Sequence, residues 1–108
     1  MVLKAIVLVW ALLIAAPAVP VLAHSPLFMC YFEGGGDTVL CEGGYSDGSC
    51  ASCTPIYVVD ADSGDIVACG MLDKYGFYEF DRPGGEFLVL FDGGEGHQVE
   101  LHSSDIQE

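Results

Sequence analysis

Short runs of apolar residues, separated by turns rich in glycine and aspartate, follow one another through most of the chain. The pattern predicts strands at 27–33, 38–45, 56–60, 65–70, 77–80, 86–91 and 97–102. Glycine and aspartate are typical of the turns between them, because glycine accepts positive φ and aspartate bonds to nearby backbone groups. Seven short strands at regular spacing predict an all-β fold, an antiparallel β-sandwich.

Two of the predicted strands differ in the arrangement of their apolar residues. In 97–102, Val99 and Leu101 alternate with polar residues, which predicts a half-buried strand. In 86–91 nearly every residue is apolar, which predicts a central strand with both faces covered. The tail at 103–108 is polar, and we expect it to fray.

The first 23 residues have the pattern of a secretory signal. A short basic start precedes an unbroken apolar run at 5–16, and small or tolerated residues at 21–23 offer a cleavage site. The run is shorter than the roughly 20 residues of a membrane span. We therefore expect a removable signal-peptide helix at 1–23, one domain at 24–108, and a periplasmic or extracellular location. The alternatives are an uncleaved N-terminal anchor and cleavage after Ala18.

The charge of the chain is strongly acidic. It contains 16 acidic and three basic residues, and only Lys74 and Arg82 of the basic ones follow residue 23. Such a surface repels nucleic acid and anionic lipid and attracts cations or basic partners. We expect no nucleic-acid partner and, after cleavage, no membrane-spanning segment. No arrangement of serine, histidine and acid stands out as a catalytic motif, so we expect that the protein is not an enzyme.

The stretch from Pro55 to Glu100 resembles the carboxypeptidase regulatory-like domain, a transthyretin-like sandwich. Three segments carry the resemblance: a strand and Ser-Gly turn at 56–64, a Gly-x-x-Asp-x-x-Gly-Phe pattern at 70–77, and a Pro-Gly-Gly-Glu-Phe segment at 83–87. The resemblance implies a seven-stranded transthyretin-like or immunoglobulin-like antiparallel sandwich. It implies little about function, because this module occurs in many proteins.

A second resemblance extends over most of the chain after the signal. The pieces are an Ala-His at 23–24, an aromatic strand at 28–32, a Tyr-Ser-Asp-Gly loop at 45–48 and an Asp-Gly-Gly-Glu-Gly-His segment at 92–97. They are similar to small exported accessory proteins of energy-coupling-factor nickel/cobalt transporters, whose pattern more usually has alanine at the position of Gly93. The resemblance implies a metal-handling role beside membrane transporter components.

Two other functions remain open. One is an interaction or structural β-sandwich module of the cell envelope, which would bind another protein through a sheet edge or loops without a metal. The other is a thiol-based redox protein.

His24 and His97 are the candidate metal ligands. Cleavage after Ala23 would expose the α-amine of His24 beside its own imidazole, and these two nitrogens suit Cu²⁺ or Ni²⁺. His97 begins the last predicted strand, and the first and last strands of many sandwiches are neighbours. We therefore hypothesise that both histidines meet at one end and bind Ni²⁺, Co²⁺ or Cu²⁺. The alternative is that His24 is a terminal residue and His97 a turn residue, neither of them a ligand.

All five cysteines lie in the part expected to be exported, where disulfides are permitted. Cys50 and Cys53 have redox or metal-ligand spacing, but they precede no predicted helix whose dipole would stabilise a thiolate. A tight hairpin between the first two strands would place Cys30 opposite Cys41. Transthyretin-like sandwiches tend to place these strands in different sheets, so this disulfide stays one of two alternatives. Cys50 and Cys53 would form a metal site if Cys30, Cys41 or Cys69 lay close to them. The alternatives are a plain disulfide, or unpaired small core residues at 30, 41 and 69.

Overall fold

The computed structural model describes residues 25–107, which form seven strands and two short 3₁₀ helices. The predicted signal peptide at 1–23 and the predicted metal ligand His24 lie outside these residues. The sequence predicts each strand to within one residue at either end. No helix of the described part is long and apolar enough to cross a membrane. The elements in chain order are β1 (Pro26–Glu33), η1 (Gly34–Gly36), β2 (Thr38–Tyr45), β3 (Pro55–Asp60), β4 (Ile66–Met71), β5 (Phe77–Asp81), β6 (Phe87–Asp92), β7 (Gln98–His102) and η2 (Ser103–Asp105).

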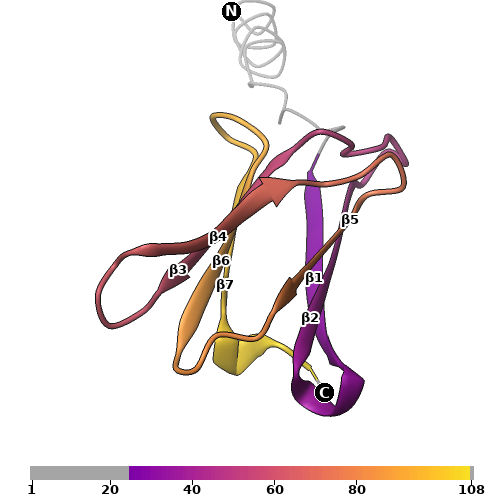
Figure 1. The fold of residues 1–108 in the computed structure, drawn as a ribbon. Helices are drawn as coiled ribbons and strands as arrows, with labels where there is room; N and C mark the ends of the chain where they lie inside the picture. Colours follow the sequence, from indigo (N-terminus) through magenta and orange to yellow (C-terminus); the bar gives the residue numbers. More distant parts are fainter. Residues whose placement is uncertain (1–24, 108) are drawn as a thin grey trace, which may run out of the picture.

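The strands form two antiparallel sheets, as the turn pattern predicts (Figure 1). One sheet has the order β1-β2-β5 and the other the order β4-β3-β6-β7. β1 and β2 are hydrogen-bonded neighbours in one sheet, with Glu33 paired to Thr38 beside the turn. The resemblance to transthyretin-like domains did not predict this pairing. It arises because the glycine turn at 34–36 returns the chain directly along β1.

The core lies between the two sheets. Phe87, Val89 and Phe91 of β6 are buried, because alternate residues of a strand point to the same face. Aromatic rings of β1 meet them from the opposite sheet. The ring centroids of Phe28 and Phe91 are 5.2 Å apart, and those of Phe32 and Phe87 are 6.4 Å apart. These contacts hold the two sheets face to face.

β6 is central, as its apolar composition predicts, but only one of its faces is covered. It is hydrogen-bonded to β3 on one side and to β7 on the other. Leu88 and Leu90 point away from the core and are half-buried. The prediction that both faces are covered is therefore wrong for the described part of the chain. A two-layer fold buries one face of each sheet, and the neighbouring strands only partly shield the outer one.

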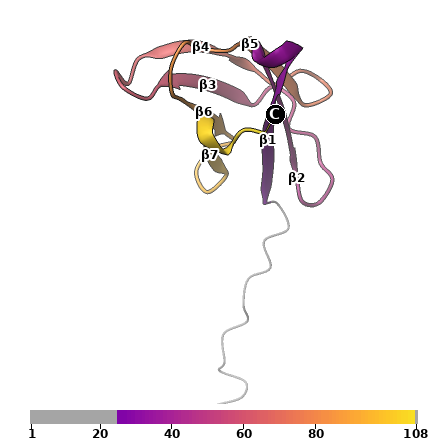
Figure 2. The same ribbon diagram turned by 90° about the horizontal axis from the view of Figure 1, so that it is seen from below.

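The C-terminal segment joins the two sheets instead of fraying (Figure 2). Ile106 is only 7% exposed, and the backbone N–H of Phe32 in β1 donates to the carbonyl of Gln107 at 2.8 Å. The helix η2 turns the chain from β7 toward β1 so that these contacts form. The expectation of a frayed tail is wrong, because one apolar side chain and a strand-like hydrogen bond offset the polar composition.

A tight corner connects β4 to β5 and thus one sheet to the other. The Asp73 carboxylate accepts hydrogen bonds from the backbone N–H groups of Phe77 at 3.0 Å and Tyr75 at 2.9 Å. These two hydrogen bonds hold the pKa of Asp73 below its usual range, and the bond from Phe77 has the larger effect. Gly76 has φ +86°, and a side chain there would begin 2.5 Å from the carbonyl oxygen of Gly43. Only glycine accepts this positive φ and also leaves room for the Gly43 carbonyl.

Candidate metal site at one end of the sandwich

The turn between β6 and β7 contains the predicted ligand His97. Asp92 begins the turn, and its carboxylate accepts from the backbone N–H of Gly94 at 3.2 Å and from the Gln98 side chain at 3.1 Å. The N–H of His97 donates to the carbonyl of Gly94 at 2.9 Å. Gly94 adopts φ +97°, which favours glycine at this position. The turn is therefore held at both of its ends by short local hydrogen bonds.

His97 is half-buried, and its ring has two neighbours that orient it. Its Nδ1 atom lies 3.3 Å from the carbonyl oxygen of Glu95. Its ring meets the Tyr45 ring edge to face, at a centroid distance of 6.0 Å. When Nδ1 carries the proton and donates to Glu95, Nε2 keeps a lone pair, the form in which imidazole binds metals.

The start of the described chain lies at this same end. The N–H of Ser46 donates to the carbonyl of Ser25 at 2.8 Å, and the N–H of Ser25 donates to the Ser46 hydroxyl at 3.0 Å. Ser46 directly follows Tyr45, the residue whose ring contacts His97. Figure 1 shows the β6–β7 turn and the beginning of β1 at one end of the two sheets. Ser25, the residue after His24, is thus bonded to Ser46, which directly follows the residue that contacts His97.

Tyr45 is the contact that sequence reasoning missed. The sequence marks it only as part of the Tyr-Ser-Asp-Gly motif at 45–48. Its contact with His97 forms because the end of β2 and the start of β7, which belong to different sheets, lie on the same side. Tyr45 also packs on Phe91 at a centroid distance of 6.2 Å, which ties the site to the core.

The described residues alone do not complete a metal site. Within residues 25–107, no three histidine, cysteine or acidic side chains are grouped closely enough to hold a metal ion. His97 is the one predicted ligand placed there, and the structure does not bring Cys30, Cys41 or Cys69 into a site with Cys50 and Cys53. Any metal at this end would take further ligands from His24 or from a partner.

Gly93 leaves almost no space beside His97. A Cβ at this position would lie 2.7 Å from the carbonyl oxygen of His97 and 2.8 Å from the Tyr45 hydroxyl. Contacts this short force a shift of the backbone or of the ring. A glycine at this position therefore allows the Tyr45 hydroxyl and the His97 carbonyl to lie this close to the turn.

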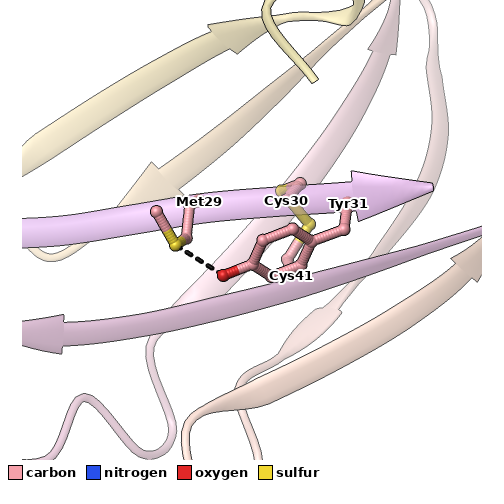
Figure 3. The surroundings of a disulfide bond; sticks show 4 residues. All are labelled: Met29, Cys30, Tyr31 and Cys41. Atoms are coloured by element: carbon pink, nitrogen blue, oxygen red, sulfur yellow. Dashed lines mark hydrogen bonds between the residues drawn. A yellow bond between two sulfur atoms is a disulfide. The ribbon is translucent and has the colours of Figure 1, made fainter. Parts of the chain in front are cut away.

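Cys30 and Cys41 form a disulfide in the interior (Figure 3). They are directly paired across β1 and β2, with Cα atoms 4.0 Å apart, as the hairpin alternative requires. Both residues are buried. On the opposite face of β1, the Tyr31 hydroxyl donates to the Met29 sulfur at 2.6 Å. This disulfide is a structural cross-link, because water and metal ions do not reach it.

Cys50 and Cys53 are free and exposed in the loop between β2 and β3. Cys50 pairs with Gly44 in an isolated bridge, and its thiol lies 3.4 Å from the carbonyl oxygen of Lys74. Cys53 has φ +64° and is the one non-glycine residue of the described chain in this left-handed region. The loop is not the start of a helix, the position that thioredoxin-type redox motifs of this spacing occupy.

Cys69 is the third free cysteine and lies on β4. It is exposed, so the interpretation of this residue as a small core side chain is wrong. It is paired with Tyr57 of β3, and its side chain points to the outer face of the four-stranded sheet. The neighbouring Tyr78 hydroxyl has a raised pKa, because of burial first and the Cys69 thiol second.

The chain matches no protein-family model, and neither curated proteins nor solved structures show a significant similarity to it.

Proposed function

We propose that this protein is an exported, non-enzymatic accessory of a nickel/cobalt-type uptake transporter, and that it handles the metal ion at the end of the sandwich that carries His97. The proposal rests on the sequence resemblance at 23–24, 28–32, 45–48 and 92–97. The seven strands in two antiparallel sheets are in accord with the transthyretin-like class that we propose for the domain.

One structural observation carries the proposal. Two of the four resembling segments, 45–48 and 92–97, meet at one end, where Tyr45 contacts His97 and Ser46 is hydrogen-bonded to Ser25. A mature N-terminus at His24 would begin one residue from this cluster. Its amine and imidazole would then supply two nitrogen ligands and His97 Nε2 a third, a donor set that suits Ni²⁺, Co²⁺ and Cu²⁺.

The acidic surface supports the same role. Asp47 and Glu95 lie in the β2–β3 and β6–β7 loops at this end and Asp92 ends β6, and neither loop contains a lysine or an arginine among the described residues. Carboxylates around a site raise the local concentration of divalent cations and steer them toward it. The exposed ends of β2 and β6 would thus guide a cation to the imidazole without binding it themselves.

Titration of Ni²⁺ into the secreted protein tests the proposal. N-terminal sequencing first establishes that the chain begins at His24. We expect His24→Ala and His97→Ala each to weaken binding by roughly tenfold or more, which corresponds to about 1.4 kcal/mol. His102→Ala is the matched control, because His102 lies at the opposite end of β7 and should leave the affinity unchanged.

The competing function is a metal-free interaction module. A hollow of about 450 Å³ on the outer face of the four-stranded sheet, lined by Tyr57, Leu90 and Glu100 among others, favours this alternative. The titration separates the two functions. No Ni²⁺ binding, or equal affinities of wild type and His97→Ala, would remove the metal proposal and leave the interaction module.

A further inference from the structure

β4 is the strand of the larger sheet that has an open edge on the side away from β3. The sheet order β4-β3-β6-β7 gives β4 one strand neighbour among the described residues. The N–H of Leu72 donates to the carbonyl of Thr54, the residue before β3. Because hydrogen-bonding direction alternates along an antiparallel strand, the N–H and C=O groups of Cys69 and Met71 point away from β3. They are available to another strand.

The side chains of β4 do nothing to protect this edge. Ile66 is 60% exposed, Val67 51% and Met71 62%, and the strand contains no charged residue and no proline. Edge strands of natural proteins usually carry charges, prolines or bulges that prevent pairing with another chain. A register shift opposite Val58 and Val59 disturbs one end of β4 only. The rest of the strand forms a regular, apolar edge.

The other three edge strands of the described part are guarded. β1 is met by Gln107 of the C-terminal segment. β5 carries the exposed Glu79 and Asp81, and β7 carries the exposed Glu100. Among the edges, β4 alone is therefore both open and uncharged.

We propose that two copies of this protein associate through their β4 strands, which pair antiparallel about a two-fold axis near Cys69 and extend the four-stranded sheet from one copy into the other. Such an interface is self-complementary, since the same strand supplies both sides. It would bury the apolar side chains of Ile66, Val67 and Met71 that each copy exposes.

Charge selects a second copy as the occupant. The chain has 16 acidic and three basic residues, so a basic partner would be drawn to the carboxylate-bearing surfaces and not to this uncharged strip. Two acidic copies repel each other wherever carboxylates meet, and the six residues of β4 form a contact free of them. Asp65 and Asp73 flank the strip, and their negative charges repel those of the other copy. Added salt screens this repulsion and should therefore strengthen the association.

The thiol of Cys69 provides a chemical test of this interface. Antiparallel pairing about a nearby axis places the two Cys69 side chains on the same face, at roughly 5.5 Å between Cα atoms if they are directly opposite. A low-molecular-mass disulfide such as oxidised glutathione would then convert the two thiols to one intermolecular disulfide. Two electrons and two protons pass to the reagent, which leaves as two thiols.

Sedimentation equilibrium of the secreted protein under reducing conditions tests the association. We expect a concentration-dependent dimer, weakened roughly tenfold or more by Met71→Lys. Met29→Lys is the matched control, since Met29 is 51% exposed on the outer face of β1 and the substitution is the same. A strictly monomeric wild type, or equal dimerisation of the two variants, would overturn the proposal. Circular dichroism checks that both variants keep the fold.

Cross-linking locates the contact. In a Cys50→Ser/Cys53→Ser background, oxidised glutathione should yield a covalent dimer that Cys69→Ser abolishes. A dimer whose formation does not require Cys69 would place the contact elsewhere and contradict the β4 pairing. The outcome is independent of the metal proposal, because β4 contains neither His97 nor a residue that contacts its ring.

Discussion

The Tyr45 ring meets the His97 ring edge to face, with a centroid distance of 6.0 Å and an interplanar angle of 81°. Tyr45 ends β2 of one sheet and His97 directly precedes β7 of the other, and their contact makes one end of the sandwich a candidate site. Tyr45 is in turn fixed against Phe91 in the core. The orientation of the imidazole is therefore tied to the packing between the two sheets.

The first prediction concerns Gly93, which lies beside the His97 carbonyl and the Tyr45 hydroxyl. Gly93→Ala should destabilise the fold by about 1–3 kcal/mol, because the added methyl would contact the His97 carbonyl and the Tyr45 hydroxyl too closely. It should also weaken Ni²⁺ binding if His97 is a ligand. Denaturant unfolding and metal titration measure the two effects. Gly84→Ala is the control, since its Cβ would meet nothing within 4 Å; equal effects of both substitutions would refute the crowding at Gly93.

The second prediction concerns the disulfide between Cys30 and Cys41. The double variant Cys30→Ser/Cys41→Ser should lose about 2–4 kcal/mol of unfolding free energy, because the unfolded chain regains freedom and two hydroxyls enter the core. Denaturant unfolding with and without reductant measures this loss. Reductant should destabilise the wild type and leave the double variant unchanged. A reductant effect that survives in the variant would mean that another disulfide contributes.

The third prediction concerns the accessibility of the remaining thiols. Iodoacetamide should label Cys50, Cys53 and Cys69 in the native protein and neither Cys30 nor Cys41, since the former are exposed and the latter buried and bonded. Peptide mass spectrometry identifies the labelled positions. Reduction in denaturant should add the two missing sites. Protection of Cys50 and Cys53 together in the native state would show instead that these two form a disulfide.

The fourth prediction concerns the C-terminal segment. Ile106→Ala should destabilise the protein by about 2–5 kcal/mol, the range for truncation of a buried isoleucine. Hydrogen exchange at the Phe32 amide, which donates to Gln107, should accelerate in this variant. Gln107→Ala provides the comparison, because it removes an exposed side chain and keeps the backbone acceptor. If Ile106→Ala were as stable as the wild type, the tail would be frayed, as its polar composition predicts.

The fifth prediction concerns acid stability. The pKa of Asp73 is held below its ordinary value near 3.8 by hydrogen bonds from Phe77 and Tyr75, and that of Asp60 by bonds from Ser63 and Asp62. A carboxyl whose pKa is lowered on folding stabilises the fold above its unfolded pKa, and this contribution disappears as the pH falls through the folded value.

The wild type should therefore lose stability between about pH 5 and pH 2, the range that spans the pKa of an unfolded aspartate. Asp60→Asn and Asp73→Asn should each flatten this loss and reach the wild-type stability at the acid end. Thermal unfolding across the pH range measures the slopes. Asp81→Asn is the control, because it replaces an exposed aspartate at the end of β5. A slope unchanged in Asp60→Asn and Asp73→Asn would refute the role of these turns.

The sequence by itself determined the local structure. The alternation of Val99 and Leu101 and the glycine–aspartate turns predicted every strand, since strand period and turn chemistry depend on neighbouring residues only. The hairpin alternative for Cys30 and Cys41 was available for the same reason. The sequence also supplied the motif that contains His97.

Only the tertiary structure decided which of these segments meet. It placed β1 and β2 in one sheet, brought Tyr45 to His97 and tied Gln107 to Phe32. It also placed Cys69, as an exposed free thiol, on an edge strand of the larger sheet. No pattern along the chain predicts that this strand lies at an edge. Such contacts depend on how two sheets share one core. That is a property of packing between residues far apart in the chain, which periodicity and turn residues do not record.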